Sequence, residues 1–256
     1  MTSVRPTHLR EYMDSPDVTR DDLLRELHYI RWVNRTLGGT RVVVNHLNRW
    51  AAAGHLPAGP ITILDVATGS ADIPEAILLW AKANGRRVHI IGLDLHPVTL
   101  NIAKEWTHGA ENLSFVRADA LRLPLADNSV DIATCSMFLH HLDEVTALAV
   151  VREMLRVSRH GLIVNDLMRT RWARAAIYLL TLFSDPQSRH DARLSVTKGW
   201  TVRETLAWRD MLNAPWLACH VHPFARFTLA GLKPDNTPMP HEYSCPAIIN
   251  PAGRHG

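Results

Sequence analysis

The chain has 256 residues, of which 46% are hydrophobic and 21% charged, and this composition suits one good-sized domain with a continuous core. The formal net charge is only +3, and the basic residues form no run, so the sequence indicates no nucleic-acid-binding arm. The three cysteines fit neither a disulfide framework nor a metal-binding pair. We therefore expect a reducing compartment, with the cytoplasm as the default, and neither a signal peptide nor a membrane span.

The first part of the chain is predicted to be helical. Residues 19–53 carry apolar side chains at helical spacing, and Gly38-Gly39 interrupts them. We predict two short helices joined at these glycines. Residues 1–60 are expected to form a helical lid, residues 61–233 the main domain, and residues 234–256, which are rich in proline, a loosely ordered tail.

From residue 61 the pattern changes to short β-rich runs that alternate with helical stretches. The runs are 61–66, 87–95, 113–118, 130–136 and 161–167, and the helical stretches are 74–83, 97–106 and 145–157. Apolar strands that alternate with helices predict a doubly wound α/β domain, whose mostly parallel sheet is covered on both faces. Ligands of such sheets bind beyond the carboxyl ends of the strands.

The last third of the domain is predicted to add two helices and two strands. A helix is expected at 170–183, and its apolar stripe, from Trp172 to Phe183, is interpreted as core in preference to a pocket wall. A polar segment follows, and the capping box of Thr201 and Glu204 opens the next helix. Residues 216–233 read as two closing strands, which makes seven strands in all.

The segment ILDVATGSADIP, residues 63–74, has the form of a nucleotide-binding turn with too few glycines. A dinucleotide fingerprint would place glycines at Ala67, Gly69 and Asp72, and only Gly69 matches. A helix N-terminus tolerates the Asp72 carboxylate well, but this carboxylate would repel phosphates. Because Asp65 ends the preceding strand, the turn favours a zwitterionic or cationic ligand without phosphates.

Two further acids follow the next two strands. Asp94 closes the second strand, where a carboxylate can accept hydrogen bonds from a ribose diol. Asp119 follows the third strand and could accept an adenine amino proton while the backbone of Ala120 donates to the ring. Taken singly, Asp94 could be a solvated strand end and Asp119 a turn residue. Their order along the chain favours adenosine recognition.

Four segments carry a family resemblance: ILDVATGSAD, IIGLDLHP, FVRADALRLPL and VDIATCSMFLHHL. In order and spacing across residues 61–167 they resemble the successive motifs of class I S-adenosylmethionine-dependent methyltransferases, and more narrowly the small bacterial quinone-methyltransferase-like and small-molecule tailoring enzymes. The resemblance implies the Rossmann-like methyltransferase fold and S-adenosyl-L-methionine as cofactor. It assigns cofactor binding to Asp65, Ala67, Thr68, Gly69, Ser70, Asp94, Leu95, Asp119, Ala120 and Ser136. Ala67 and Ala71 depart from the family, because many members have glycine there.

The expected reaction is methyl transfer to oxygen, or to carbon, of a small aromatic, polyketide-like or quinone-like acceptor. A phenol with a pKa near ~10 would need a base such as histidine. His141, with His140 close behind, is the candidate base, and Asp166 could orient a histidine or accept a proton. The alternative is that both histidines only pack against and cap the helix that starts near Asp143.

Other features carry weaker hypotheses. The pair His190-Asp191 lies where the family builds its substrate cover, about residues 168–200. The HVH triplet at 220–222 would put two histidines on one face of a strand with no third ligand, so we predict no metal. The partners expected are a small-molecule acceptor and, at most, a second copy of the chain. The rival functions are an NAD(P)-dependent reductase and a non-catalytic methyltransferase-like binding module.

Overall fold

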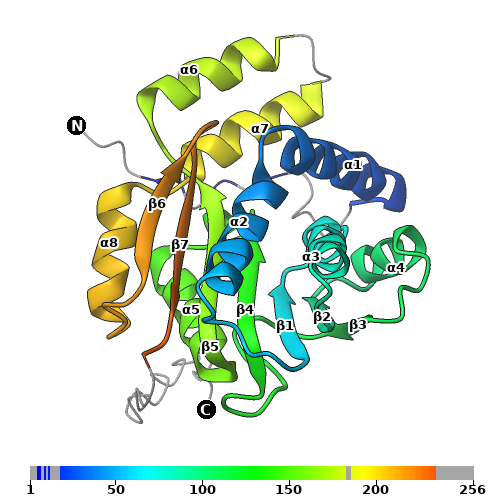
Figure 1. Cartoon of the computed structure of the whole chain (residues 1–256). Coiled ribbons are helices and arrows are strands. Elements are labelled where there is room, and N and C mark those ends of the chain that lie inside the picture. The colour runs from blue at the N-terminus through cyan, green and yellow to red at the C-terminus, as the bar shows by residue number, and fades with distance from the viewer. Residues whose placement is uncertain (1–4, 7–8, 10, 12–17, 183–185, 235–256) are drawn as a thin grey trace, which may run out of the picture.

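The structure is a computed structural model that describes residues 5, 6, 9, 11, 18–182 and 186–234. A central twisted sheet carries helices on both faces (Figure 1). The strands are β1 (Ile61–Val66), β2 (Val88–Asp94), β3 (Leu113–Arg117), β4 (Val130–Ser136), β5 (Ser158–Leu167), β6 (Ala218–His222) and β7 (Arg226–Leu232). The helices are α1 (Arg20–Thr36), α2 (Gly39–Ala52), α3 (Asp72–Ala83), α4 (Pro97–Trp106), the 3-10 turn η2 (Leu139–His141), α5 (Glu144–Val157), α6 (Arg171–Leu180), α7 (Pro186–Lys198) and α8 (Val202–Met211).

The order of the strands creates a crevice in the middle of the sheet. The seven strands run in the order β3-β2-β1-β4-β5-β7-β6. β1 pairs in parallel with both β2 and β4, while β7 is antiparallel to β5 and β6. The chain therefore winds outward from β1 to β3 and returns to the other side at β4, which makes the carboxyl ends of β1 and β4 the switch point where ligands bind. The predicted mostly parallel, seven-stranded, doubly wound sheet is confirmed.

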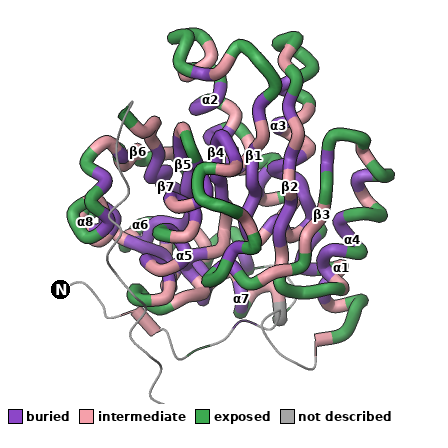
Figure 2. The backbone as a smooth tube through the Cα atoms, turned by 90° about the horizontal axis from the view of Figure 1, so that it is seen from below, coloured by how far each residue is buried: buried purple, intermediate pink, exposed green. Residues whose placement is uncertain are grey.

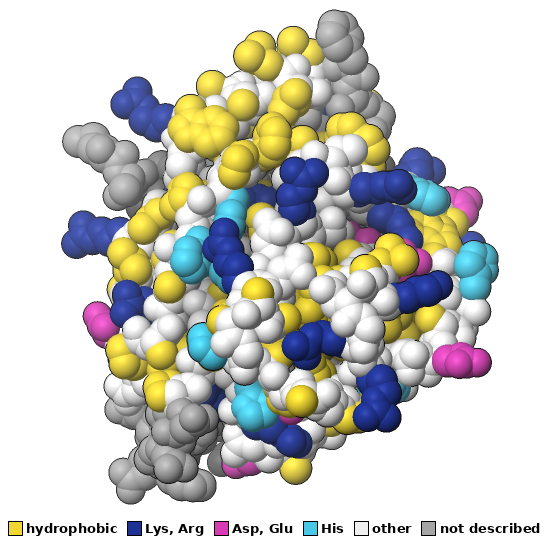
Figure 3. All heavy atoms as spheres, in the orientation of Figure 1, with side chains coloured by type: hydrophobic (Ala, Val, Ile, Leu, Met, Phe, Trp, Pro, Cys, Tyr) yellow, Lys and Arg dark blue, Asp and Glu magenta, His cyan; other side chains and the backbone are white. Residues whose placement is uncertain are grey.

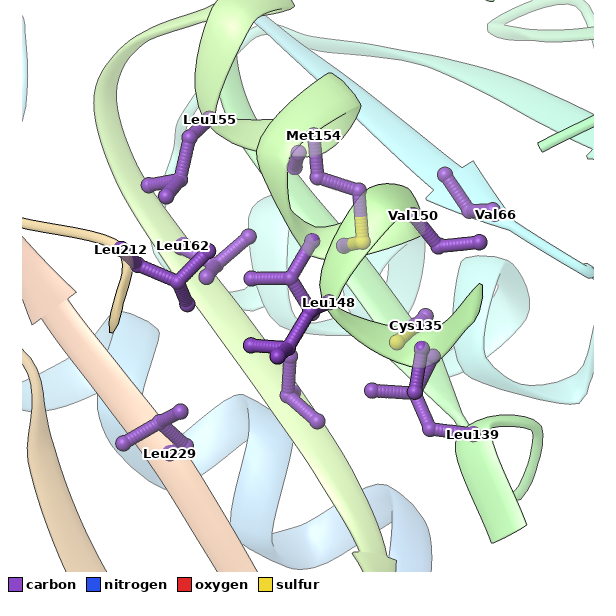
Figure 4. Packing of buried hydrophobic residues seen from close by; sticks show 14 of the residues in the cluster. Val66, Cys135, Leu139, Leu148, Val150, Met154, Leu155, Leu162, Leu212 and Leu229 are labelled. Atoms are coloured by element: carbon purple, nitrogen blue, oxygen red, sulfur yellow. The ribbon is translucent and has the colours of Figure 1, made fainter. Parts of the chain in front are cut away.

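Alternation along the strands divides the core between the two faces of the sheet. In β1, Ile61 and Ile63 pack with side chains of α2 and α3, whereas Leu64 and Val66 pack with those of α5. Figure 4 shows Leu148, Val150 and Met154 of α5 against this second face. Figure 2 shows that the central strands are largely buried and that exposed residues lie toward the periphery, on the outer sides of helices and in connections.

The N-terminal helices form as the sequence predicts. Thr19 caps α1 in a capping box with Asp22, and Gly38, at φ 82°, turns the chain into α2. A Cβ on Gly39 would lie 2.2 Å from Asn34 Oδ1, so α1 and α2 approach too closely for any other residue there. α2 packs into the core against β1, and α1 lies over the carboxyl end of the sheet.

Two expectations for the region after β5 are corrected. The polar segment predicted before α8 is mostly a helix, α7, whose few apolar residues form no clear stripe that sequence inspection could detect. The stripe on α6 is not core: Trp172, Tyr178 and Leu179 are all more than half exposed, and Phe183 lies outside the described residues. The capping box at Thr201 and the closing strands β6 and β7 are confirmed.

The tail predicted to be loosely ordered, from residue 235 onward, lies outside the described residues. Among the helices that the structure describes, none combines the length and apolar content that crossing a membrane requires.

Candidate functional site

The turn between β1 and α3 keeps its nucleotide-binding shape without the missing glycines. Ala67, Gly69 and Ala71 all have positive φ values, of 54°, 52° and 58°. An L-residue pays roughly 1–2 kcal/mol for this left-handed conformation. The two alanines therefore hold the same backbone that glycine would adopt freely, and the methyl group of Ala71 is fully buried.

Asp65 is a buried acid at the base of this turn. One of its oxygens, Oδ2, accepts a hydrogen bond from Thr68 Oγ1 at 2.7 Å, and the other, Oδ1, is buried without a partner among the described residues. Burial raises the pKa of Asp65 to about 8, against the lowering effect of the Thr68 hydrogen bond and with help from the charges of Asp72 and Asp94. The site thus holds a carboxyl group that lacks a cationic partner.

Asp72, the first residue of α3, is also a buried acid with one unpartnered oxygen among the described residues. Its Oδ1 accepts from Ser70 Oγ at 3.1 Å, its Oδ2 is buried and unpartnered among the described residues, and burial raises its pKa. The side chain of Asn34 on α1 opposes this rise in pKa, and its Oδ1 accepts from the guanidinium of the buried Arg226 at 2.9 Å. A polar chain therefore joins Arg226, Asn34 and Asp72 across three elements.

Asp94 is placed beside the turn by the pairing of β1 with β2. Its Oδ2 accepts from the backbone N–H of Gly69 at 3.1 Å and its Oδ1 from that of His96 at 3.0 Å. Burial raises the pKa of Asp94, and these two hydrogen bonds oppose the rise. Each carboxylate oxygen can accept a further hydrogen bond, because an ionised carboxyl group offers about four acceptor positions.

A large cavity, of about 920 Å³, opens at the carboxyl ends of β1, β2 and β4. Most of the predicted cofactor residues line it: Asp65, Ala67, Thr68, Gly69, Ser70, Asp94, Leu95 and Ser136. An adjoining cavity of about 180 Å³ is lined by the remaining two, Asp119 and Ala120, and shares Ala67, Asp94 and Leu95 with the first. The fold therefore brings all ten predicted residues to one continuous site, which has a size typical of small-molecule sites.

The residues at the end of β4 divide between this cavity and the core. His141 lines the large cavity, whereas His140 and Asp166 are buried and are not among its lining residues. His140 Nδ1 lies 2.6 Å from Asp166 Oδ1, and the His140 backbone N–H donates to Asp166 Oδ2 at 3.0 Å. Burial acts to raise the pKa of Asp166, but the charge and hydrogen bonds of His140 outweigh it and hold this pKa below its ordinary value.

The comparisons with known proteins agree with this geometry. Residues 63–161 match the family model described as methyltransferase domain. Over these residues the chain is therefore similar to a methyltransferase domain. The match covers most of the stretch in which the four sequence motifs resemble those of S-adenosylmethionine-dependent methyltransferases.

Two relatives of the methyltransferase domain are demethylmenaquinone methyltransferases. The one from Deinococcus radiodurans is 42% identical over 116 residues, which are 44% of this chain and 45% of the relative. The one from Staphylococcus epidermidis is 35% identical over 98 residues, 38% of this chain and 39% of the relative. The chain thus spans less than half the length of each of these relatives.

A solved structure shares the fold over most of the chain. It is magnesium protoporphyrin IX methyltransferase from Synechocystis PCC 6803 with bound SAH, at 16% identity and a TM-score of 0.57, covering 84% of this chain and 94% of that one. At this identity the likeness concerns the fold alone, and it covers more of the chain than residues 63–161.

Glu11 and Lys198 belong to the same site, and sequence inspection did not find them. Glu11 is buried at 3.8 Å from His141 Nε2 and 4.0 Å from His140 Nε2. The Lys198 ammonium, also buried, donates to Glu11 Oε1 at 3.3 Å and lines the large cavity. Both residues lie far in sequence from the motifs of the methyltransferase domain, and no local pattern marks them.

Glu11, His140 and His141 are also the described residues that come nearest to a metal site. Their ligand atoms lie within 4.8 Å of one another. Imidazole and carboxylate ligands together suit several divalent ions. In this arrangement, however, the Lys198 ammonium already supplies positive charge to Glu11, and a divalent ion would have to displace it. The absence of a metal stays a prediction.

The residues of the two remaining hypotheses from the sequence do not line the cavity. His190 is exposed and Asp191 buried on α7, and neither lines the cavity.

The HVH triplet lies near a third histidine, His46 of α2, whose ring centroid lies 5.3 Å from that of His220. His46 Nε2 lies 2.8 Å from Thr228 Oγ1, and burial, together with the charges of His220 and His222, lowers the pKa of His46 to about 4.

Proposed function

We propose that this chain transfers a methyl group from S-adenosyl-L-methionine to an oxygen, or a carbon, of a small aromatic, polyketide-like or quinone-like acceptor. The observation that carries the proposal is the pair of buried, unpartnered carboxylate oxygens, Asp65 Oδ1 and Asp72 Oδ2, in a cavity whose other predicted cofactor residues surround them. An ammonium group, with three donors and a positive charge, complements such a pair.

The donor set fits the whole cofactor. The acids Asp65 and Asp72 suit its amino-acid end, and the backbone at Gly69 lies close enough to Asp94 for both to meet a ribose. Asp119, whose Oδ1 accepts from the N–H of Leu121 at 2.9 Å, retains acceptor positions for an adenine amino group in the smaller cavity. The acids Asp65, Asp72 and Asp94 beside the turn disfavour the diphosphate of a nicotinamide dinucleotide, because each of them repels it when ionised.

The bound cofactor supplies an activated methyl group, so the protein must hold the acceptor in line with it and exclude water. His141, on the cavity wall, is the residue that we assign as the base for a phenolic or enolic acceptor. We assign His140 and Asp166 as positioning residues that act through His141. Because an ionised carboxylate only accepts, Asp166 fixes the proton of His140 on Nδ1 and turns Nε2 toward Glu11.

The acceptor class rests on the cavity wall and on the relatives. The cavity also has apolar lining residues, among them Leu23, Leu27 and Ile30 of α1. Such a wall suits a flat hydrophobic acceptor. The named relatives, demethylmenaquinone methyltransferases, support a quinone-like acceptor.

The described thiols, Cys135 and Cys219, are free, which supports the proposal of a reducing compartment such as the cytoplasm.

Thermal shift with S-adenosylhomocysteine and with NADP⁺ separates the proposed function from the reductase. The homocysteine derivative should raise the Tm and NADP⁺ should not. Asp94→Asn should reduce the shift, whereas Asp210→Asn, an exposed carboxylate on α8, should leave it unchanged. A shift with NADP⁺ alone would favour the reductase, and no shift at millimolar concentration of either would favour a non-catalytic binding module.

Turnover of a labelled methyl donor with a panel of phenols and hydroquinones tests the base. His141→Ala should lower kcat by roughly 10²–10⁴-fold, the usual range for a general base, with little change in cofactor affinity. The exposed His55→Ala is the matched control. Equal activity of the His141 variant would remove histidine from the mechanism without affecting the cofactor assignment.

A further inference from the structure

The outer face of α6 is hydrophobic and exposed. Leu179 is 69% exposed, Trp172 57% and Leu182, just beyond the helix, 52%. These positions recur at the spacing of one helical face, and Tyr178 and Leu180 lie beside them, each also more than half exposed. Figure 3 shows the hydrophobic side chains gathered over the end of the molecule that α6 occupies in Figure 1.

The inner face of the same helix is already used for packing. Ala173 is buried in a cluster with Leu167 and Val196, and Ile177 packs against that cluster. A helix that is apolar on both faces needs cover on both, and an exposed apolar patch of this kind marks an interaction site. The outer face of α6 is therefore a candidate interaction surface.

The charges around this face are basic. α6 itself contains Arg171 and Arg174 and no acidic residue. From α7, the Arg193 guanidinium lies 4.1 Å from the centroid of the Tyr178 ring, and Arg189 donates to the backbone oxygens of Thr181 and Leu182 at the end of α6. Arginines thus flank an apolar face that carries one tryptophan and one tyrosine.

We propose that α6 is an interfacial helix that binds the surface of a bilayer containing anionic phospholipids. Apolar and aromatic side chains on one face, with arginines at its edges, are the features of helices that lie in the headgroup region, where the arginines meet lipid phosphates. Basic flanks argue for this occupant over a second copy of the chain, which would bring arginines against arginines. Within the described residues, Ile177 on the inner side of α6 packs against the same buried cluster as Met137, which lines the large cavity. A bilayer bound at α6 therefore lies next to the proposed acceptor site.

Co-sedimentation of the full chain with vesicles tests this inference without any assay of methyl transfer. The native chain should bind vesicles of phosphatidylcholine with about a third phosphatidylglycerol, and should bind pure phosphatidylcholine less, since anionic lipid adds an attraction for each arginine. Leu179→Glu should reduce the bound fraction by about tenfold, because burial of one leucine is worth at least that factor in partition. Leu79→Glu on α3 is the matched control, because Leu79 is also a leucine 69% exposed.

Three outcomes would overturn the inference. The first is an equal loss of binding in the Leu79 and Leu179 variants, and the second is no binding of the native chain to either vesicle. The third is a lipid-free dimer in sedimentation velocity that Leu179→Glu dissociates, which would assign the face to a second copy. Because Leu179 and Leu79 both project into solvent, circular dichroism should show folded variants. Cofactor binding, measured in parallel, stays intact even if the membrane inference fails.

Discussion

The pKa of Asp65 leads to a pH dependence of cofactor binding that can be calculated. With a pKa of about 8 in the ligand-free protein, Asp65 is mostly protonated at neutral pH. The ionised fraction is about one in a hundred at pH 6 and about one in ten at pH 7. If the ammonium group of the ligand binds the ionised carboxylate, the affinity for S-adenosylhomocysteine should rise about tenfold between these two pH values.

The same shift has the opposite effect on the stability of the free protein. A carboxyl group whose pKa is raised in the folded state stabilises that state below its unfolded pKa, and this stabilisation is lost as the pH rises toward the folded pKa. For Asp65 the window runs from the ordinary carboxyl pKa of 3.8 to about 8. At 1.36 kcal/mol per pH unit, the loss in the free energy of unfolding is of the order of 5 kcal/mol.

Isothermal titration calorimetry and urea unfolding across this range, on the native chain and on Asp65→Asn, check both effects. The variant should bind more weakly at neutral pH, show less change in affinity with pH, and be more stable than the native chain at pH 8. Asp72 and Asp94 also have raised pKa values, so some slope should persist in the variant. An affinity that is flat with pH in the native chain, or a slope that the substitution does not change, would refute the reasoning.

Three further predictions concern the backbone and the acid–histidine cluster. Ala71→Gly should leave the free energy of unfolding in urea within about 1 kcal/mol of the native value, because relief of the strain at φ 58° offsets the loss of the buried methyl group; a loss of several kcal/mol would contradict the assigned backbone. Gly39→Ala should lower it by roughly 1–3 kcal/mol, since the new Cβ would lie 2.2 Å from Asn34 Oδ1; an unchanged midpoint would mean that α1 and α2 are farther apart. Extensive dialysis against EDTA should leave methyl transfer unchanged, because Lys198 already compensates Glu11; a loss that zinc or manganese restores would show a metal in the cluster.

Much of the proposed cofactor site follows from the sequence because its residues lie at strand ends. Once the strands at 61–66, 87–95 and 113–118 are recognised, parallel pairing brings their carboxyl ends to one edge of the sheet. Asp65, Asp94 and Asp119 then gather there whatever the details of packing. The positive φ values at Ala67 and Ala71 are the exception, because the sequence shows alanine and only the folded turn shows the strain.

The face of α6 shows where sequence reasoning reaches its limit. An apolar stripe at helical spacing is most often core, and the sequence cannot tell which of two apolar faces meets the protein. In the structure Ala173 and Ile177 take the inward side and Leu179 is left outside.

The sequence by itself determined the fold class, the methyltransferase motifs and the acids that surround the proposed cofactor site. These are local patterns whose meaning depends on order and spacing along one stretch of chain. Only the tertiary structure decided that His141 lines the cavity while His140 is buried against Asp166. Only the tertiary structure likewise brought Glu11 beside the two histidines and Lys198 beside Glu11. Contacts between residues so far apart in sequence depend on how the N-terminal segment and α7 pack onto the sheet, and no local pattern encodes that packing.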